Sequence, residues 1–299
     1  MNRKEFGQLL ATLRKDMGWT QFQLAELVEI DEAVISQVER GVKKHYEPEL
    51  LFSLANAFQL TTLERREFFL AASGLEKKQI VRQAFANIKT DVFDVRKVLE
   101  RMVDLTGEIR LPAFLGDVFG DVLAANRMML AFYDIPPDMF ENASRIPGGY
   151  NTARINFGRA LIGRNHASDN WEQYALNSMH AFRVNSLRYR AHPYFKYLMK
   201  AFRNPIEYPF FDRFWKMVSS TEQDREANVD YFSYTHPALG RLNYVASTIT
   251  AVTSSGELFL IQNVPLDEHT DRVFDQLKNA GTGAIRFAPW PEKNMPGSG

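Results

Sequence analysis

Residues 20–41, TQFQLAELVEIDEAVISQVERG, contain two short apolar helical patterns that lie almost back to back. Thr20 and Gln23 match a capping box, in which each side chain bonds the backbone N–H of the other residue, and this predicts a helix over 21–28. Isolated helices this short are marginal in water. The segment is therefore expected to fold only among neighbouring helices.

A second helix is predicted over 32–40. Asp31 is a favourable N-cap for it, and Gly41 is a favourable stop just after its last turn. Only the turn 29–31 separates the two helices, and the small side chain of Ala25 lets them cross closely. Two short helices joined in this way form a helix-turn-helix, whose second helix can enter the major groove of DNA at its N-terminal end.

The sequence resembles the Xre/lambda-Cro-type helix-turn-helix family over 4–58. The resemblance rests on LRKDMGWTQFQLAELV, on VISQVERG, and on a following helix that begins near Pro48 and contains LANAF. It implies double-stranded DNA as a partner. One departure is Glu29, which occupies a turn position usually filled by glycine. If that residue needs a positive φ, the strain costs about 1 kcal/mol.

The second helix of the motif supplies the residues expected to read bases. Gln37 suits adenine, Glu32 can accept a hydrogen bond from cytosine, and Ala33 can touch a thymine methyl group. Flanking arginine and lysine side chains are expected to contact phosphates, which sets the register without reading sequence. The complete predicted DNA-binding set is Gln21, Glu32, Ala33, Ser36, Gln37, Arg40, Lys43, Lys44 and Arg14.

The charge balance limits how this DNA binding would work. The net charge of the whole chain is zero, and acidic side chains outnumber basic ones within 1–73. This balance predicts weak non-specific affinity, with two copies needed to span two half-sites, so we expect a homodimer. The alternative is a helical docking domain whose polar face is only solvated.

Composition restricts the class of protein further. The chain has 299 residues, of which 45% are hydrophobic and 24% are charged, which suits about two domains. Cysteine is absent, which excludes disulfides, thiolate metal sites and cysteine nucleophiles and fits a reducing, cytoplasmic location. No apolar run reaches the roughly 18 residues of a membrane-spanning helix, so no membrane span is expected.

Catalytic motifs are missing from the sequence. The six histidines are scattered, and there is no HExxH zinc motif, no GxSxG nucleophile and no GxxxxGK[ST] phosphate loop. NAGTGAI contains a pair of glycines, but it follows a predicted helix and precedes a predicted strand, which is the reverse of the order in a dinucleotide site. The sequence therefore predicts a protein that is not an enzyme and requires no metal or cofactor.

Four parts are predicted along the chain: a helix-turn-helix domain over 1–74, a connecting helix over 75–105, a ligand-binding domain over 106–290 and a disordered tail over 291–299. The last helix of the first domain is expected from Thr62, as its cap, to Gly74. The connecting part carries a heptad seam. This seam indicates either a dimer helix that connects the DNA-binding domain to the ligand-binding domain or a helix laid along its own domain. The seam residues are Val81, Phe85, Ile88, Val92, Val95, Leu99 and Met102.

The remainder alternates between strand and helix patterns. LPAFLGDVFGDVLAAN reads as two strands about a Gly-Asp turn, ending at Asn126 where a helix begins, and a long aromatic helical stretch is expected over 138–219. VDYFSYTHP, RLNYVASTITAVT and ELFLIQNVPL then read as strands. The predicted fold class is α+β overall, with an all-α helix-turn-helix domain followed by an antiparallel sheet with helical cover.

The second domain resembles the ligand-binding region of MmyB-like regulators. The matching features are VLAAN, the segment DNWEQ, and FDRFWKMV followed by THPALGRLNY. The resemblance implies a PAS-like fold whose pocket takes a long-chain fatty acid or a similar acyl ligand. Together with the first domain it implies a ligand-responsive transcription regulator. The alternative is a DNA-binding protein whose second domain is a protein-interaction module without a small-molecule ligand.

A long acyl chain needs an elongated apolar cavity with one polar end. Arg183 is the first choice for binding a carboxylate, and Asn126, Arg154, Arg190 and His192 are alternatives. Aromatic and methionine side chains are expected to form the rest of the wall. The predicted ligand pocket is Phe114, Leu123, Asn126, Met129, Phe157, Trp171, Met179, Phe182, Arg183, Trp215 and Tyr244.

Overall fold

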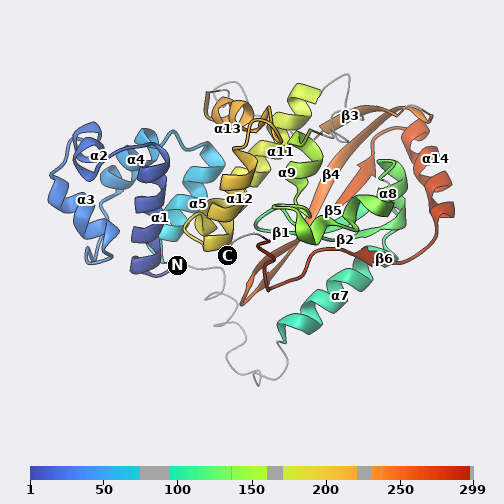
Figure 1. Cartoon of the computed structure of the whole chain (residues 1–299), viewed down its shortest axis with the longest axis horizontal. Coiled ribbons are helices and arrows are strands. Elements are labelled where there is room, and N and C mark those ends of the chain that lie inside the picture. The colour runs from blue at the N-terminus through green and yellow to red at the C-terminus, as the bar shows by residue number, and fades with distance from the viewer. Residues whose placement is uncertain (75–93, 136, 160–170, 221–230, 237, 297–299) are drawn as a thin grey trace.

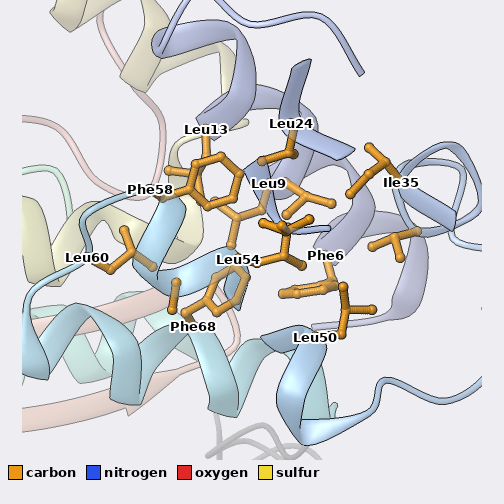
Figure 2. Close-up of a cluster of buried hydrophobic side chains, with 14 of the residues drawn as sticks. Phe6, Leu9, Leu13, Leu24, Ile35, Leu50, Leu54, Phe58, Leu60 and Phe68 are labelled. Carbon is orange, nitrogen blue, oxygen red and sulfur yellow. The ribbon is translucent and has the colours of Figure 1, made fainter. Parts of the chain in front are cut away.

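The computed structural model describes residues 1–74, 94–135, 137–159, 171–220, 231–236 and 238–296. A helical domain lies at one end and a sheet with helices on both faces lies at the other (Figure 1). The first domain consists of α1 (Arg3–Asp16), α2 (Gln21–Leu27), α3 (Glu32–Glu39), α4 (Pro48–Ala57) and α5 (Thr62–Ser73). Its apolar side chains, among them Phe6, Leu24, Ile35, Leu54 and Phe68, point toward one another in a single core (Figure 2).

The predicted helix signals are present in the structure. Thr20 and Gln23 form both bonds of the capping box at α2, and the Asp31 side chain accepts from the backbone N–H of Ala33 at α3. Ala25 is buried where α2 meets α3. Glu29 has φ 55°, so the turn does hold a non-glycine residue in the left-handed region, at a cost of about 1 kcal/mol.

The second domain is built on one antiparallel sheet with the strand order β3-β4-β5-β1-β2-β6. The strands are β1 (Ala113–Asp117), β2 (Val122–Asn126), β3 (Tyr231–His236), β4 (Gly240–Thr253), β5 (Gly256–Pro265) and β6 (Ala284–Arg286). The α-helices are α7 (Val95–Glu108), α8 (Arg127–Phe132), α9 (Thr152–Phe157), α11 (Trp171–Ser186), α12 (Pro193–Phe202), α13 (Phe211–Ser220) and α14 (Glu268–Leu277). Short 3₁₀ turns are η2 (Pro137–Phe140), η3 (Ala143–Arg145), η4 (Leu187–Tyr189) and η6 (Lys278–Ala280). The α+β fold class is confirmed, and within the described residues the long helical stretch is divided into several shorter helices.

The two faces of the sheet have different cover. On one face, Met102 and Val103 of α7 pack against Leu115 of β1 and against Leu258 and Leu260 of β5. The helices α8, α9 and α11 lie on the other face (Figure 1). Because side chains alternate along a strand, Phe259, which lies between Leu258 and Leu260, faces that second side.

The heptad seam can be compared with the structure only from residue 95 onward. Val95, Leu99 and Met102 of α7 pack in the same cluster as the sheet of their own domain. In this part of the chain the structure therefore agrees with the second interpretation of the seam, a helix that packs along its own domain. The seam residues within 75–93 lie outside the described residues.

The prediction of a disordered tail over 291–299 is wrong for residues 291–296. Lys293 has a side chain only 8% exposed, and its Nζ is paired with Asp117 and Asp121. The same Nζ lies 5.3 Å from the ring centroid of Phe119 and 5.1 Å from that of Tyr194. The tail is ordered because one lysine inserts into a buried acidic and aromatic site, which the Gly/Pro composition does not reveal. Residues 297–299 lie outside the described part.

Candidate functional sites

The helix α3 presents a polar face to solvent. Glu32, Ala33, Gln37 and Arg40 are exposed, and Ser36 is half-buried. After the helix, Lys43 is half-buried and Lys44 is exposed. These predicted residues thus lie together at one surface of the first domain, where a nucleic acid could reach them.

Arg14 and Gln21 are committed to other partners. Arg14 is buried, and its guanidinium donates to both carboxylate oxygens of Glu39, at 2.6 and 3.0 Å, and to the carbonyl of Trp19 at 2.6 Å. Gln21 Nε2 donates to Glu39 Oε2 at 2.7 Å. The prediction that Arg14 contacts phosphate is therefore wrong, because its charge is used to fasten α1 to α3. Gln21 lies beside it, half-buried, at the start of α2.

A cavity of about 1140 Å³ lies over the second face of the sheet. Strand alternation explains its floor, because Glu257, Phe259, Ile261 and Asn263 of β5 line it in period two. The neighbouring strands add smaller residues such as Gly116 of β1. Drug-sized ligand pockets span about 300–1,000 Å³, so this one has room for a long ligand.

Four of the predicted pocket residues line this cavity: Phe114, Met129, Phe182 and Tyr244. The other hydrophobic ones fill the core. Leu123 packs beneath α7, Phe157 and Met179 lie in the core among the helices, and Trp171 packs against Phe210 and Phe214. The predictions for Leu123, Phe157, Trp171 and Met179 as pocket residues are wrong, because these side chains are packed within the core clusters and do not line the cavity.

The polar candidates for the ligand head group also have structural roles. Asn126 caps α8 and accepts from the backbone N–H of Ala113 at 3.1 Å. Arg154 donates to the carbonyl of Gly149 at 2.9 Å, and His192 caps α12. None of these three residues lines the described cavity. The prediction of Asn126 as a pocket residue is therefore wrong, and so are those of Arg154 and His192 as alternative ligands of the carboxylate.

Arg183 is fixed by Glu64, which belongs to the helix-turn-helix domain. Its Nε and Nη2 donate to the two oxygens of Glu64 at 3.0 and 2.8 Å, and its Nη1 donates to the carbonyl of Trp215 at 2.8 Å. Arg190 adds a further bond to Glu64 at 2.5 Å. Both guanidinium groups lie over the Trp215 ring, each 5.1 Å from its centroid. The predictions of Arg183 and Trp215 as pocket residues, and of Arg190 as an alternative, are wrong for this reason.

This Glu64 cluster (Glu64, Arg183, Arg190 and Trp215) is almost completely withdrawn from water. The side chains of Glu64, Arg183 and Arg190 are 0%, 4% and 4% exposed. Burial alone would raise the pKa of Glu64, but Arg190 and Arg183 outweigh it and lower the pKa to about 2. Burial also lowers the pKa of Arg190, against the opposing effect of Glu64. The carboxylate is thus held ionised at the contact between the two domains.

The sequence contained one signal for this residue. Thr61 and Glu64 form a capping box at the start of α5, so Thr61 is the N-cap and the prediction of Thr62 is wrong by one residue. That signal explains why an acidic residue stands there but not why it is buried. Its partners are 119 and 126 positions away in sequence, a separation that no local pattern reports.

The cavity reaches the first domain. Thr62, Leu63, Arg66 and Glu67 of α5 form part of its wall. The helix α11 lines it as well and carries Arg183, which follows the cavity residue Phe182 directly. One wall of the cavity and the contact with the helix-turn-helix domain are therefore made by the same two helices, which lie side by side.

Two other features are absent from the described residues. No cluster of three or more histidine and acidic side chains with the geometry to hold a metal ion occurs there. Nor does any helix in that part of the chain combine the length and hydrophobicity needed to cross a bilayer.

Comparisons with known proteins agree with this architecture. Residues 5–68 match a family described as a helix-turn-helix domain. The competence pilus inhibition repressor of Acinetobacter baylyi (strain ATCC 33305 / BD413 / ADP1) is 29% identical over 92 residues, which are 31% of this chain and 80% of that repressor. Residues 95–277, more than half of the chain, match the MmyB-like transcription regulator ligand binding domain. The chain therefore belongs to the MmyB-like transcription regulators, in which a DNA-binding motif is joined to a ligand-binding domain.

Proposed function

We propose that this protein binds operator DNA as a homodimer through α3 and that a fatty-acid-like molecule in the cavity controls this binding. The ligand would change how α5 rests against α11 and so reposition the two reading helices. A ligand shifts such an equilibrium only through its different affinity for the two arrangements. The proposal therefore requires a ligand that touches the contact between the domains.

The observation that supports this most is the shared wall of the cavity. Thr62 and Leu63 of α5 line it, while Glu64, the next residue, is held by Arg183 of α11. A ligand that fills the cavity touches the helix on which the first domain rests. No long relay between distant sites is needed.

The lining supports an acyl chain as the ligand. Between the two ends of β5 the floor is formed by Phe259 and Ile261, with Phe114 beside Ile261 in the register of β1 and β5. Met129 adds a flexible thioether, which adapts to a mobile chain. Apolar walls of this kind with polar groups at a few places are typical of small-molecule sites.

The proposal is tested by selecting the full-length protein against random DNA duplexes and then titrating the recovered site with hexadecanoic acid. We expect one enriched, two-fold symmetric sequence whose affinity changes at least several-fold when the acid is added. Ala246→Phe, which fills the cavity floor, should remove the response to the acid. Lipids extracted from the purified protein, identified by mass spectrometry against an empty-vector control, report the natural occupant. No enriched sequence, or one whose affinity ignores every acid tested, would contradict the proposal.

The reading helix is tested separately with Gln37→Ala and Arg40→Ala. Loss of a bidentate contact to a base relaxes the preference at one position and costs about 1–3 kcal/mol on the preferred base only. Loss of a phosphate contact lowers affinity for all sequences alike and reduces the salt slope by about one. We expect the first result for Gln37 and the second for Arg40, measured by fluorescence anisotropy at several salt concentrations. Glu26→Ala, at an exposed position of α2, is the control.

A further inference from the structure

Along β5, the floor of the cavity has a polar residue at each end of an apolar middle. Glu257 lies at one end of its floor and Asn263 at the other, with Phe259 and Ile261 between them. Asn263 stands six positions after Glu257, so at about 3.3 Å per residue the two ends are about 20 Å apart. The two polar ends differ in charge, and this difference determines which functional groups of a ligand each end can bind.

The end at Glu257 is charged and adjoins the first domain. Tyr189 donates to Glu257 Oε2 at 2.7 Å, and Arg188 Nη1 lies 3.6 Å from Glu257 Oε1. Arg188 Nε is buried and has no hydrogen-bond partner among the described residues. A guanidinium binds a carboxylate best through two parallel N–H groups. Arg188 thus keeps one N–H group that its protein neighbours do not bond.

The end at Asn263 is neutral. Tyr133 and Tyr244 share a hydrogen bond of 2.9 Å, and Tyr174 donates to Asn156 at 3.3 Å. These four side chains line the cavity together with Asn263. Burial raises the pKa of each of these tyrosines well above its ordinary value, so all three keep their protons. The Asn263 Nδ2 is buried against this group, beside the Tyr133 hydroxyl.

A carboxylate would be poorly placed at the neutral end. Burying an ionised group without a partner charge costs far more than burying a neutral one that is hydrogen-bonded. A hydroxyl or carbonyl group, in contrast, can both accept from Asn263 and bond a tyrosine hydroxyl. The chemistry of the two ends therefore selects two different functional groups.

Resting on the proposed function, we propose that the ligand carries two polar groups about 15 carbons apart, a carboxylate bound by Arg188 and a neutral hydroxyl or carbonyl bound beside Asn263. The length follows from a carbon zigzag with bonds of about 1.5 Å at about 111°, which advances about 1.3 Å per carbon. The ligand class is a long-chain acid oxygenated at or near its far end. Its carboxylate lies next to α5, where it can act on the contact between the domains.

The test compares the binding of 16-hydroxyhexadecanoic acid, hexadecanoic acid and 1,16-hexadecanediol to the full-length protein by calorimetry. We expect the hydroxy acid to bind about tenfold more tightly than the plain acid, since one or two net hydrogen bonds are gained. Asn263→Leu should reduce this ratio to about one. Gln262→Leu, the neighbouring residue on the opposite face of β5, is the matched control and should keep the ratio.

The charged end of the cavity is tested with the variant Arg188→Gln. This change should weaken both acids about tenfold and leave the affinity of the diol unaltered. Tyr174→Phe provides a second variant at the neutral end if Asn263→Leu does not fold. Equal affinities of the two acids for the wild-type protein would overturn the proposal while leaving the proposed function in place. Failure of every acid to bind would overturn both.

Discussion

Glu64→Gln is expected to lower the free energy of unfolding by about 3 kcal/mol at neutral pH. Removing one partner of a buried ion cluster leaves the other charges uncompensated, which typically costs about 3–5 kcal/mol. Here two guanidinium groups, those of Arg183 and Arg190, would remain buried without their anion. Glutamine at this position preserves the capping box with Thr61. The loss therefore reports the missing charge and not a damaged helix start.

The pH dependence of this effect has a defined sign. The folded-state pKa of Glu64 is about 2, lowered from 4.5, so its contribution is fully present above about pH 4.5 and is lost as the pH falls through 2. A shift of about 2.5 pH units corresponds to about 3 kcal/mol. The difference between wild type and variant, measured by urea unfolding, should be constant from pH 7 to 5 and then shrink toward pH 2.

Glu49→Gln, at an exposed position in the first turn of α4, is the control and should change stability by less than about 0.5 kcal/mol. If Glu64→Gln were equally harmless, the two domains would not depend on the Glu64 cluster for their contact. The same variant bears on regulation, because the cavity wall would lose its charged link to α5. Under the proposed function it should bind the ligand but transmit a smaller change to DNA affinity.

The helix-turn-helix could be predicted from sequence because its signals are local. The capping box at Thr20, the N-cap at Asp31 and the stop at Gly41 each depend on residues within a few positions. The strands of the second domain could be predicted as well, because their sequences are rich in β-branched and aromatic residues and alternate. Such local interactions can be predicted without knowing which distant parts of the chain pack against them.

The ligand cavity was harder to predict from sequence, because no local pattern distinguishes a side chain that lines a cavity from one that fills the core. Large residues such as Phe157 and Met179 occupy the core among the helices. The cavity wall includes the small residues Gly116, Ala181 and Ala246, but also large ones such as Phe114 and Tyr244. An aromatic residue in a sequence is therefore weak evidence for a pocket.

The partners of the buried charges could not be predicted from sequence for a related reason. An arginine on a helix is usually solvated, and Arg183 is predicted to bind the carboxylate because it stands beside Phe182 and four residues after Met179. Its partner Glu64 belongs to another domain. Arg14 and Glu39 repeat the pattern within the first domain. Each of these pairs forms only after the elements have packed.

Lys293→Met should produce the other large loss, about 3–5 kcal/mol at pH 8, because it leaves Asp117 and Asp121 facing each other without a cation. Both carboxylates are buried, and Asp121 also accepts from Tyr194 at 2.7 Å. The methionine preserves the apolar stem against the Phe119 and Tyr194 rings. The loss should be accompanied by faster proteolysis within residues 291–296, since Lys293 fastens this segment to the sheet domain.

The loss should become smaller as the pH is lowered. Burial raises the pKa of Asp117 to about 6 even though Lys293 opposes the shift, so without the lysine the pKa rises further. A group whose folded-state pKa is raised stabilises the fold below its unfolded value, and this contribution is lost as the pH rises through the folded pKa. The variant should therefore be closest to wild type near pH 5 and furthest from it at pH 8, measured by thermal unfolding. Lys278→Met removes an exposed lysine paired with Asp275, and it should show neither the loss nor the pH dependence. A pH-independent deficit in Lys293→Met would mean that lost packing, and not the pair of carboxylates, is what the lysine compensates.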